Sequence, residues 1–405
     1  MKKDNLVYKN FIQSDYLKKK FNNKLNFSFS KIVEEINKNI DVKKDTFNLL
    51  SKYLKFNFNL KDLNKFKKYK SVVMIGMGGS ILGAESLYEF FNYKIKKKFY
   101  FLDNLDENKI IKVKKKIQIN KTLFIIISKS GETIETLSNL FYFNILKKYP
   151  RNIILISEKK NSPLFYLSEK YNLFYVEHKK YIGGRYSVLT EVGMIPAFLM
   201  GVDIKKLRMN IRKFLKNKEK KFLRESVVKL SNLLMQKKFS NLIFLNYSPE
   251  LEKFLFWCQQ LIAESLGKKK NGFLPLISNS PKDHHSLLQL YLDGPNDKIF
   301  YIFSTKEKSK TKLVFKDSLS KISYLNRKTL YQVKIAQKNA MVKTLTKKNI
   351  PFREFTINNF KEETLGELFS YFILETAIVG KLIKINPFDQ PAVESVKNFT
   401  KNLLK

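Results

Sequence analysis

Two polar segments of the sequence combine side chains that could exchange protons with a substrate. Gln260 and Glu264 are four residues apart in a helical pattern, so both side chains lie on one helix face. His284 and His285, two of only three histidines, stand in a loop with a proline and an aspartate. Carboxylates and imidazoles are common general acids and bases. Taken alone, however, a helix carboxylate is more often solvated, and a loop histidine more often belongs to the surface.

A third polar segment lies near the end of the sequence. Residues 386–391, Asn-Pro-Phe-Asp-Gln-Pro, form a rigid polar turn that leads into a helical pattern with Glu394 and Lys397. The chain has 77 Lys and Arg residues, so Lys397 by itself predicts nothing.

Residues 128–133, Ser-Lys-Ser-Gly-Glu-Thr, join an apolar run to a helical pattern. Three hydroxyl groups near a helix N-terminus, with free backbone N–H groups and a permissive Gly131, suit a dianionic phosphate. The alternative is an ordinary helix cap, because Ser and Thr are favoured there and Glu132 could also serve.

A second turn of similar character covers residues 76–80, Gly-Met-Gly-Gly-Ser, and also follows an apolar run. It resembles a dinucleotide-binding fingerprint only loosely, because its third glycine comes too early. Both turns stand at the ends of neighbouring strands in one predicted domain. Together they predict a small, glycine-lined cup that is rich in hydroxyl groups.

The elements that must position these turns are apolar strands alternating with helices. Strands that are apolar throughout indicate a parallel sheet covered on both faces. The pattern occurs twice along 405 residues, which is longer than one core usually spans. We therefore expect an α/β fold of two three-layer α/β/α sandwich domains with mainly parallel sheets. The expected strands are residues 71–75, 122–127, 152–157 and 173–176 in the first domain, and 241–245, 299–303 and 352–357 in the second. The expected boundaries are 1–65 for an N-terminal helical segment, 66–205 and 225–385 for the domains, and 386–405 for a C-terminal helical segment.

The composition argues against several classes of protein. A formal charge of +41 suggests nucleic acid as a partner, but the lysines are spread along the whole chain and arginine is scarce. A specific nucleic-acid binder usually clusters its charge and uses arginine, so we expect no specific nucleic-acid partner. The single cysteine, Cys258, allows no internal disulfide and no Cys-based zinc site, and its apolar neighbours suggest an inert buried thiol. The sequence shows no signal peptide and no run of roughly 18 apolar residues, which predicts a cytoplasmic protein without a membrane partner.

Six segments in the same order resemble the glucose-6-phosphate isomerase (phosphoglucose isomerase) family, whose members consist of two sugar-isomerase (SIS) domains. The resemblance covers about residues 65–400, and the most specific segment is 183–187, Gly-Gly-Arg-Tyr-Ser. The other five segments are residues 76–84, 128–133, 260–268, 283–294 and 386–397. The resemblance implies a reversible, metal-independent isomerisation of glucose 6-phosphate and fructose 6-phosphate, a step of glycolysis and gluconeogenesis, without a cofactor.

The resemblance also assigns roles to residues. Glu264 is implied as the general base that moves a proton between carbons 2 and 1 through a cis-enediol, and Arg185 stabilises the developing enediolate. His285 and Lys397 open the sugar ring, and Gln260 orients the substrate. In this family the histidine comes from the neighbouring subunit, which implies a homodimer with His285 donated across the interface. The substrate-binding residues implied are Ser128, Ser130 and Thr133 with backbone groups around Lys129 for the phosphate, and Gly79 and Ser80 for the sugar.

Some residues depart from the family pattern, and rival functions stay open. Ala392 stands where many relatives have glycine, and His178 matches no motif and is expected at the surface. A non-catalytic sugar-phosphate sensor would have lost the base, the arginine or the lysine, whereas Glu264, Arg185 and Lys397 are present. A dual glucose/mannose phosphate isomerase is the other alternative, and the sequence does not separate it from a strict enzyme.

Overall fold

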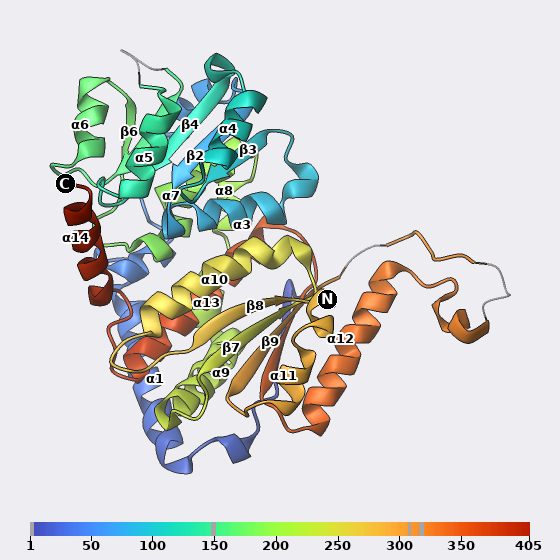
Figure 1. Ribbon diagram of the computed structural model, residues 1–405. Helices are drawn as coiled ribbons and strands as arrows, with labels where there is room; N and C mark the ends of the chain where they lie inside the picture. The colour runs from blue at the N-terminus through green and yellow to red at the C-terminus, as the bar shows by residue number, and fades with distance from the viewer. Residues whose placement is uncertain (1–3, 147–150, 307–308, 316–319) are drawn as a thin grey trace.

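Two five-stranded sheets organise the molecule (Figure 1). The computed structural model describes residues 4–146, 151–306, 309–315 and 320–405. The first sheet has the order β3-β2-β4-β5-β6, and every pair of neighbours is parallel. The expected α/β fold with mainly parallel sheets is confirmed. The strands of this sheet are β2 (Ser71–Gly76), β3 (Lys98–Leu102), β4 (Thr122–Ile127), β5 (Ile153–Ser157) and β6 (Phe174–Glu177).

The second sheet has the order β1-β10-β9-β7-β8 and contains one antiparallel strand. β1 runs antiparallel to β10, with Leu6 opposite Ile357, so the expectation of helix throughout residues 1–65 is wrong at this strand. Five residues at a sheet edge, half-buried and exposed in alternation, are too short a pattern to distinguish from a loop. The strands are β1 (Leu6–Asn10), β7 (Asn241–Asn246), β8 (Leu274–Asn279), β9 (Lys298–Thr305) and β10 (Phe352–Ile357).

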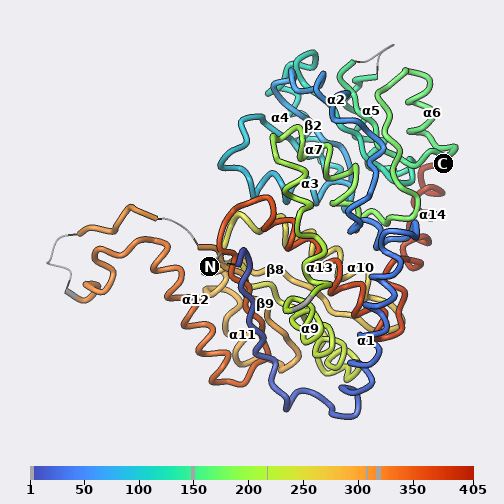
Figure 2. Tube along the Cα trace, turned by 180° about the vertical axis from the view of Figure 1, so that it is seen from behind, coloured from blue at the N-terminus to red at the C-terminus, as the bar shows by residue number. Residues whose placement is uncertain are grey.

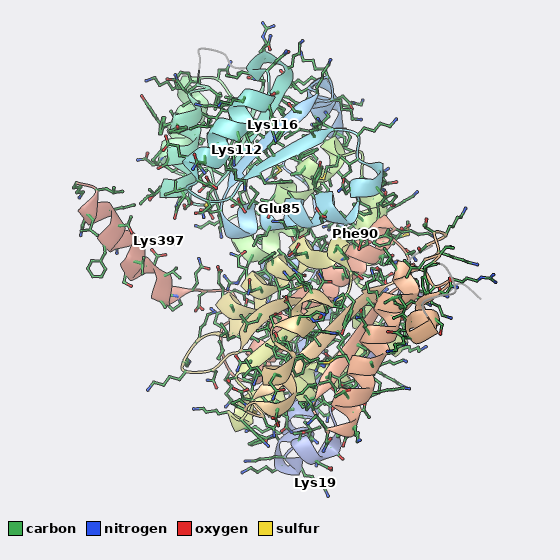
Figure 3. The ribbon with its side chains drawn as sticks, turned by 45° about the vertical axis from the view of Figure 1, so that its right-hand side comes forward. Lys19, Glu85, Phe90, Lys112, Lys116 and Lys397 are labelled. Atoms are coloured by element: carbon green, nitrogen blue, oxygen red, sulfur yellow. The ribbon has the colours of Figure 1, made fainter. Side chains whose placement is uncertain are left out.

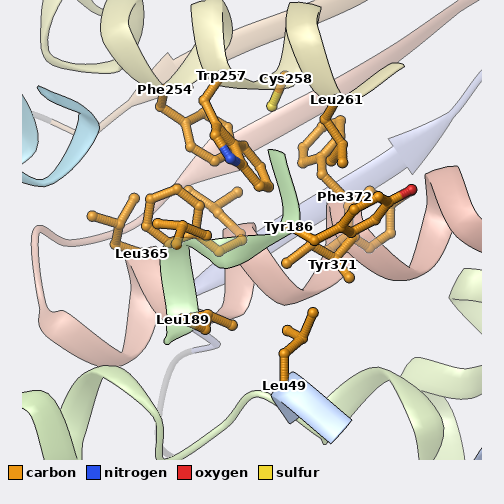
Figure 4. Close-up of a cluster of buried hydrophobic side chains, with 14 of the residues drawn as sticks. Leu49, Tyr186, Leu189, Phe254, Trp257, Cys258, Leu261, Leu365, Tyr371 and Phe372 are labelled. Atoms are coloured by element: carbon orange, nitrogen blue, oxygen red, sulfur yellow. The ribbon is translucent and has the colours of Figure 1, made fainter. Parts of the chain in front are cut away.

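Helices cover both faces of each sheet. A central group of helices fills the space between the two sheets and buries one continuous apolar core, which includes Trp257 and Tyr186 (Figure 4). Separate clusters line the outer face of each sheet. The central helices are α1 (Lys19–Asn39), α3 (Leu82–Phe90), α7 (Glu191–Leu199), α9 (Asn217–Gln236), α10 (Glu252–Leu266) and α13 (Glu362–Leu382). The outer helices are α4 (Glu107–Lys116), α5 (Ile134–Phe143) and α6 (Pro163–Lys170) on the first sheet, and α11 (Leu288–Asp293) and α12 (Leu330–Lys347) on the second.

The two ends of the chain lie in different parts of the molecule. α1 packs beside α9 and α13, on the side of the second sheet (Figure 2). The chain ends in α14 (Glu394–Leu403), which lies at the side of the molecule, beside the helices of the first sheet (Figure 1). Two further short helices are α2 (Leu60–Leu63) and α8 (Ile204–Leu207). Among the helices of the described residues, none is long and apolar enough to cross a membrane.

Candidate active site

The two glycine- and hydroxyl-rich turns lie at the same edge of the first sheet. β2 and β4 are parallel neighbours, and Gly76 at the end of β2 stands opposite Ile127 at the end of β4. The residues that follow, including Gly79 on one turn and Ser128 on the other, therefore leave the sheet side by side. The sequence predicts this arrangement, and the pairing of the strands confirms it.

The turn at residues 128–133 keeps the start of α5 free of side-chain caps. Gly131 has a φ of +71°, in the left-handed region that favours glycine. Thr133 is the N-cap residue, but its hydroxyl contacts Ser128 Oγ at 2.8 Å and does not cap the helix. Ser130 Oγ accepts a hydrogen bond from the backbone N–H of Glu132. The turn therefore does not act as an ordinary side-chain cap of α5. The first N–H groups of the helix face the turn without a side-chain acceptor.

Lys129 points away from this turn. Its Nζ donates to the backbone carbonyl of Lys180 at 3.0 Å and pairs with Glu158 Oε1 at 3.5 Å. Both partners stand in loops that follow strands β5 and β6. The Lys129 side chain thus links the turn to the two neighbouring loops. Only the backbone of Lys129 faces the glycine- and hydroxyl-rich cup.

Arg185 is the most heavily anchored side chain of the site. It lies in the 3₁₀ helix Gly184–Leu189 and is 3% exposed. Trp257 of α10 donates its indole N–H to the Arg185 carbonyl at 3.1 Å, which fixes the backbone. A guanidinium has five donors in a rigid fork, and here all of its directions are occupied. The acceptors are Ser265 Oγ (2.8 Å), Glu264 Oε2 (3.2 Å), Gln390 Oε1 (2.8 Å) and the carbonyls of Pro387 (2.7 Å) and Asp389 (3.0 Å).

Glu264 is held between two donors and opens onto a cavity. Gln260 Nε2 donates to Oε1 at 2.8 Å, and Arg185 Nη1 pairs with Oε2 at 3.2 Å. The spacing of Gln260 and Glu264 predicts one shared helix face, and the hydrogen bond confirms it. The Glu264 side chain is 33% exposed and lines a cavity of about 570 Å³ between the end of α10 and the C-terminal segment. An ionised carboxylate can accept about four hydrogen bonds, so lone pairs remain for a substrate.

Glycine is required where the first turn, residues 76–80, approaches the cluster formed by Arg185, Gln260 and Glu264. A Cβ on Gly79 would lie 2.3 Å from the Gly184 carbonyl carbon and 2.4 Å from the Arg185 nitrogen. A Cβ on Gly78 would lie 2.6 Å from Gln260 Nε2, and the φ of Gly78 is +51°. Ser80, half-buried, follows directly. The first turn therefore touches both the arginine and the amide that contact Glu264.

The C-terminal segment is fastened to the end of α10. Lys268 Nζ pairs with Asp389 Oδ1 at 2.9 Å and donates to the Asn386 carbonyl at 2.6 Å. The hydrogen bond from Lys268 lowers the pKa of Asp389, and burial lowers the pKa of Lys268. Ala392 has a negative φ, so alanine replaces glycine there without backbone strain.

The two adjacent histidines have different surroundings. His284 Nε2 lies 2.8 Å from the hydroxyl of Tyr247, and burial lowers the pKa of His284. His285 is exposed on the 3₁₀ helix Lys282–His285, which follows the edge strand β8. No hydrogen bond or ion pair between the described residues joins His285 to Glu264. The structure thus leaves His285 outside the cluster formed by Arg185 and Glu264.

Lys397 is also outside this cluster. It is exposed on α14, at the side of the molecule, and its Nζ pairs with Glu394 Oε1 at 2.8 Å (Figure 3). None of the residues of α14 is buried.

His178 corrects an expectation, and Cys258 agrees with one. His178 is expected at the surface but is 2% exposed at the end of β6. Burial, together with the nearby Lys129, lowers its pKa from 6.5 to about 4. One isolated histidine after a short strand carries no sequence signal that separates these environments. Cys258 is buried, as predicted, and burial raises the pKa of its thiol well above the ordinary value.

Several partners of the site were not predictable from residue patterns. Gln390 and the carbonyls of Pro387 and Asp389 bond to Arg185 across about 200 positions of sequence. Among these partners, the place of Tyr247 could have been predicted most easily. It is a hydroxyl-bearing residue directly after an apolar strand, and such residues stand at the sheet edge where ligands bind.

Comparison with known proteins places the chain among isomerases of sugar phosphates. The family model described as phosphoglucose isomerase matches residues 61–405. The chain is 32% identical over 357 residues to the glucose-6-phosphate isomerase of Methanocaldococcus jannaschii, covering 85% of this chain and 87% of the relative. It is 34% identical over 352 residues to that of Mycoplasmopsis synoviae, with coverage of 82% and 81%.

Solved structures agree with this comparison. A hypothetical protein from Thermus thermophilus superposes with a TM-score of 0.78 at 26% identity, over 96% of this chain and 99% of the other. A glucose-6-phosphate isomerase from Chlamydia trachomatis gives a TM-score of 0.75 at 18% identity, over 99% and 88% of the two chains, and so shares the fold.

Proposed function

The chain belongs to the phosphoglucose isomerase family, and we propose that Glu264 is the base with which it interconverts glucose 6-phosphate and fructose 6-phosphate. The reaction is a reversible aldose–ketose isomerisation. After ring opening, Glu264 removes the proton from carbon 2 and returns it to carbon 1, while the hydroxyl proton passes from oxygen 2 to oxygen 1. The observation that carries the proposal is the 3.2 Å contact between Glu264 and an arginine whose other donors are all engaged.

Arg185 is the residue that we assign to the enediolate. Negative charge develops on the substrate oxygens as the carbon-bound proton leaves, and a cation that is already fixed needs no reorganisation to meet it. Its five acceptors hold the guanidinium in one orientation beside Glu264. Gln260, bonded to the other carboxylate oxygen, orients the base and the substrate.

The phosphate belongs, in this proposal, to the turn at residues 128–133. Hydroxyls of Ser128, Ser130 and Thr133 and the backbone around Lys129 bind it, and the uncapped start of α5 adds N–H donors and the helix dipole. Gly79 and Ser80, on the neighbouring turn, line the sugar. Binding the phosphate away from the reacting carbons supplies energy for positioning them.

Ring opening is assigned to His285 together with Lys397. We propose a homodimer in which His285 reaches the site of the neighbouring subunit. Two features support this: His284 is engaged by Tyr247 whereas His285 is exposed, and Leu274 and Leu276 on the adjoining edge strand are 59% and 40% exposed. Exposed apolar side chains on a sheet edge are what a partner subunit covers. A cytoplasmic location, with no specific nucleic-acid partner, is part of the same proposal.

The test is conversion of fructose 6-phosphate to glucose 6-phosphate by purified protein in the presence of a chelator, with mannose 6-phosphate assayed in parallel. Rapid formation of glucose 6-phosphate supports the proposal. Turnover of both sugars at similar rates would indicate the dual-specificity alternative. Binding of the sugar phosphate without turnover would favour the sensor.

A further inference from the structure

We propose that the ion pair between Glu132 and Lys401 couples phosphate binding to the position of Lys397. Both members are positioning residues. The inference rests on the proposed function, because it takes residues 128–133 as the phosphate turn and Lys397 as the ring-side lysine.

The first observation is that, within the part of the chain that the structure describes, this pair is the side-chain hydrogen bond or ion pair that joins α14 to the rest of the protein. Lys401 Nζ lies 3.3 Å from Glu132 Oε2. Among the described residues, the other side-chain hydrogen bonds of α14 stay within the C-terminal segment 391–405. Its apolar side chains do not pack on the body of the protein: Val396 and Phe399 are both 67% exposed. Packing therefore contributes little to holding this helix, and the ion pair is what sets its orientation when the helix is docked.

The second observation is that the chain reaches both halves of the site within a few residues. Gln390, just before α14, accepts from Arg185 Nη1 at 2.8 Å, and Lys401, near its end, contacts the phosphate turn. Lys397 lies between these two anchors. It stands four residues before Lys401 and so projects from the same face of the helix. Fixing Lys401 on Glu132 consequently fixes the direction in which Lys397 points.

The third observation is the charge of Glu132. A carboxylate inside a turn that binds a dianionic phosphate repels the ligand, because like charges at close range disfavour each other. Lys401 neutralises this carboxylate when α14 is in place. A bound phosphate adds negative charge beside Lys401 and holds the helix more firmly. Linkage requires the two effects to be equal, so α14 docking and phosphate binding strengthen each other.

The strength of the pair suits reversible docking. The Lys401 and Glu132 side chains are 51% and 40% exposed, and exposed ion pairs contribute little stability. The helix can therefore leave to admit substrate and return when the phosphate is bound. A substrate that carries a phosphate thus recruits the lysine that acts on its ring.

The experiment uses the full chain and compares Lys401→Met, Glu132→Gln and their double variant. It also compares the charge swap Glu132→Lys/Lys401→Glu with the single reversals Glu132→Lys and Lys401→Glu. Lys405→Met removes a lysine from the end of the same segment and is the matched control. For each variant we would measure kcat and KM for fructose 6-phosphate and the inhibition constant of inorganic phosphate. Hydrogen exchange of residues 394–403 with and without inorganic phosphate reports helix docking independently of activity.

For Lys401→Met we expect the phosphate inhibition constant to rise about 3- to 10-fold and kcat to fall several-fold, because the repulsive Glu132 remains and Lys397 is no longer positioned. Glu132→Gln should lower kcat without raising the inhibition constant of inorganic phosphate. The double variant should recover phosphate binding but not kcat, and the charge swap should recover kcat relative to either single reversal. Phosphate should slow exchange in α14 of the unaltered protein and not in Lys401→Met.

Two results would overturn the inference: Lys401→Met behaving as Lys405→Met does, or a charge swap with a kcat no better than the single reversals. Failure of the proposed function is recognised separately. If Lys397→Met retains full kcat, Lys397 is not the ring-side lysine, whatever the hydrogen exchange of α14 shows.

Discussion

Arg185 and Glu264 meet at 3.2 Å although they belong to different halves of the molecule. Arg185 follows the last strand of the first sheet, and Glu264 stands on α10, which follows β7 of the second. The site therefore forms only when both sheets and the helices between them have packed. Two further hydrogen bonds join the same two elements: Trp257 donates to the Arg185 carbonyl, and Arg185 Nε donates to Ser265 Oγ.

Replacing Glu264 by Gln should abolish isomerisation and leave ligand binding nearly intact. The amide keeps the size of the side chain and can still bond to Gln260, but it cannot accept the proton from carbon 2. Loss of a general base typically costs 10²–10⁴-fold, so we expect kcat to fall by about 10³-fold. Steady-state assays and calorimetric binding of fructose 6-phosphate check this. Near-normal turnover by this variant would show that Glu264 is not the general base.

Gly79, in the first turn, and Gly184, at the start of the 3₁₀ helix that carries Arg185, offer a matched pair of substitutions. Gly79→Ala places a Cβ 2.3 Å from the Gly184 carbonyl carbon, so the backbone that carries Arg185 must move. We expect kcat/KM to fall by about 10²-fold or more, since misplacing a catalytic group by about 1 Å has such an effect. Gly184→Ala is the control, because nothing lies within 4 Å of its Cβ. Equal losses in the two variants would contradict the packing argument.

Donation of His285 across a dimer interface predicts complementation between inactive subunits. His285→Gln and Glu264→Gln chains, co-expressed with different tags, should form heterodimers with one site that carries both changes and one unaltered site. If the chains mix at random, half of the dimers are of this kind, and the mixture should show about a quarter of normal activity. Activity confined to the doubly tagged fraction supports donation. A heterodimer as inactive as its parents would show that His285 serves its own subunit.

His178 should make stability depend on pH. Its pKa is about 4 in the folded protein and 6.5 ordinarily, so between these values the unfolded chain binds a proton that the folded chain does not. The contribution is fully present above about pH 6.5 and is lost as the pH falls to about 4, by up to about 3 kcal/mol. Denaturant unfolding of the protein and of His178→Gln across this range tests it. The variant should lose less stability on acidification, and parallel curves would contradict the assignment.

The fold was largely predictable because its central strands are apolar along their whole length. All seven predicted strands, such as β4 and β9, are present. The three that were missed, β1, β3 and β8, all lie at sheet edges, where buried and exposed residues are mixed and where β8 also contains Pro275. A strand that is buried on both faces is a continuous apolar run and can be recognised in the sequence. A strand that is buried on only part of one face has no such pattern.

The site was predictable only in its local parts. The Gln260–Glu264 pair follows from helix geometry, and the adjacent turns follow from a parallel sheet. The contact of Gly79 with Arg185 and that of Lys401 with Glu132 join residues more than 100 positions apart, and no periodicity encodes them. Placing His285 and Lys397 at the reacting sugar stays a prediction that rests on the family resemblance and on the experiments above.

The antiparallel pairing of β1 with β10 has a consequence for how the protein is made. On the ribosome, residues 6–10 emerge more than 300 residues before their partner Phe352–Ile357. At a translation rate of about 5–20 residues per second, β1 waits tens of seconds for its place in the sheet. The first sheet, whose strands lie between residues 71 and 177, can assemble during that interval. Completion of the second sheet, and with it the α10 side of the site, is thereby deferred until Phe352–Ile357 has been synthesised.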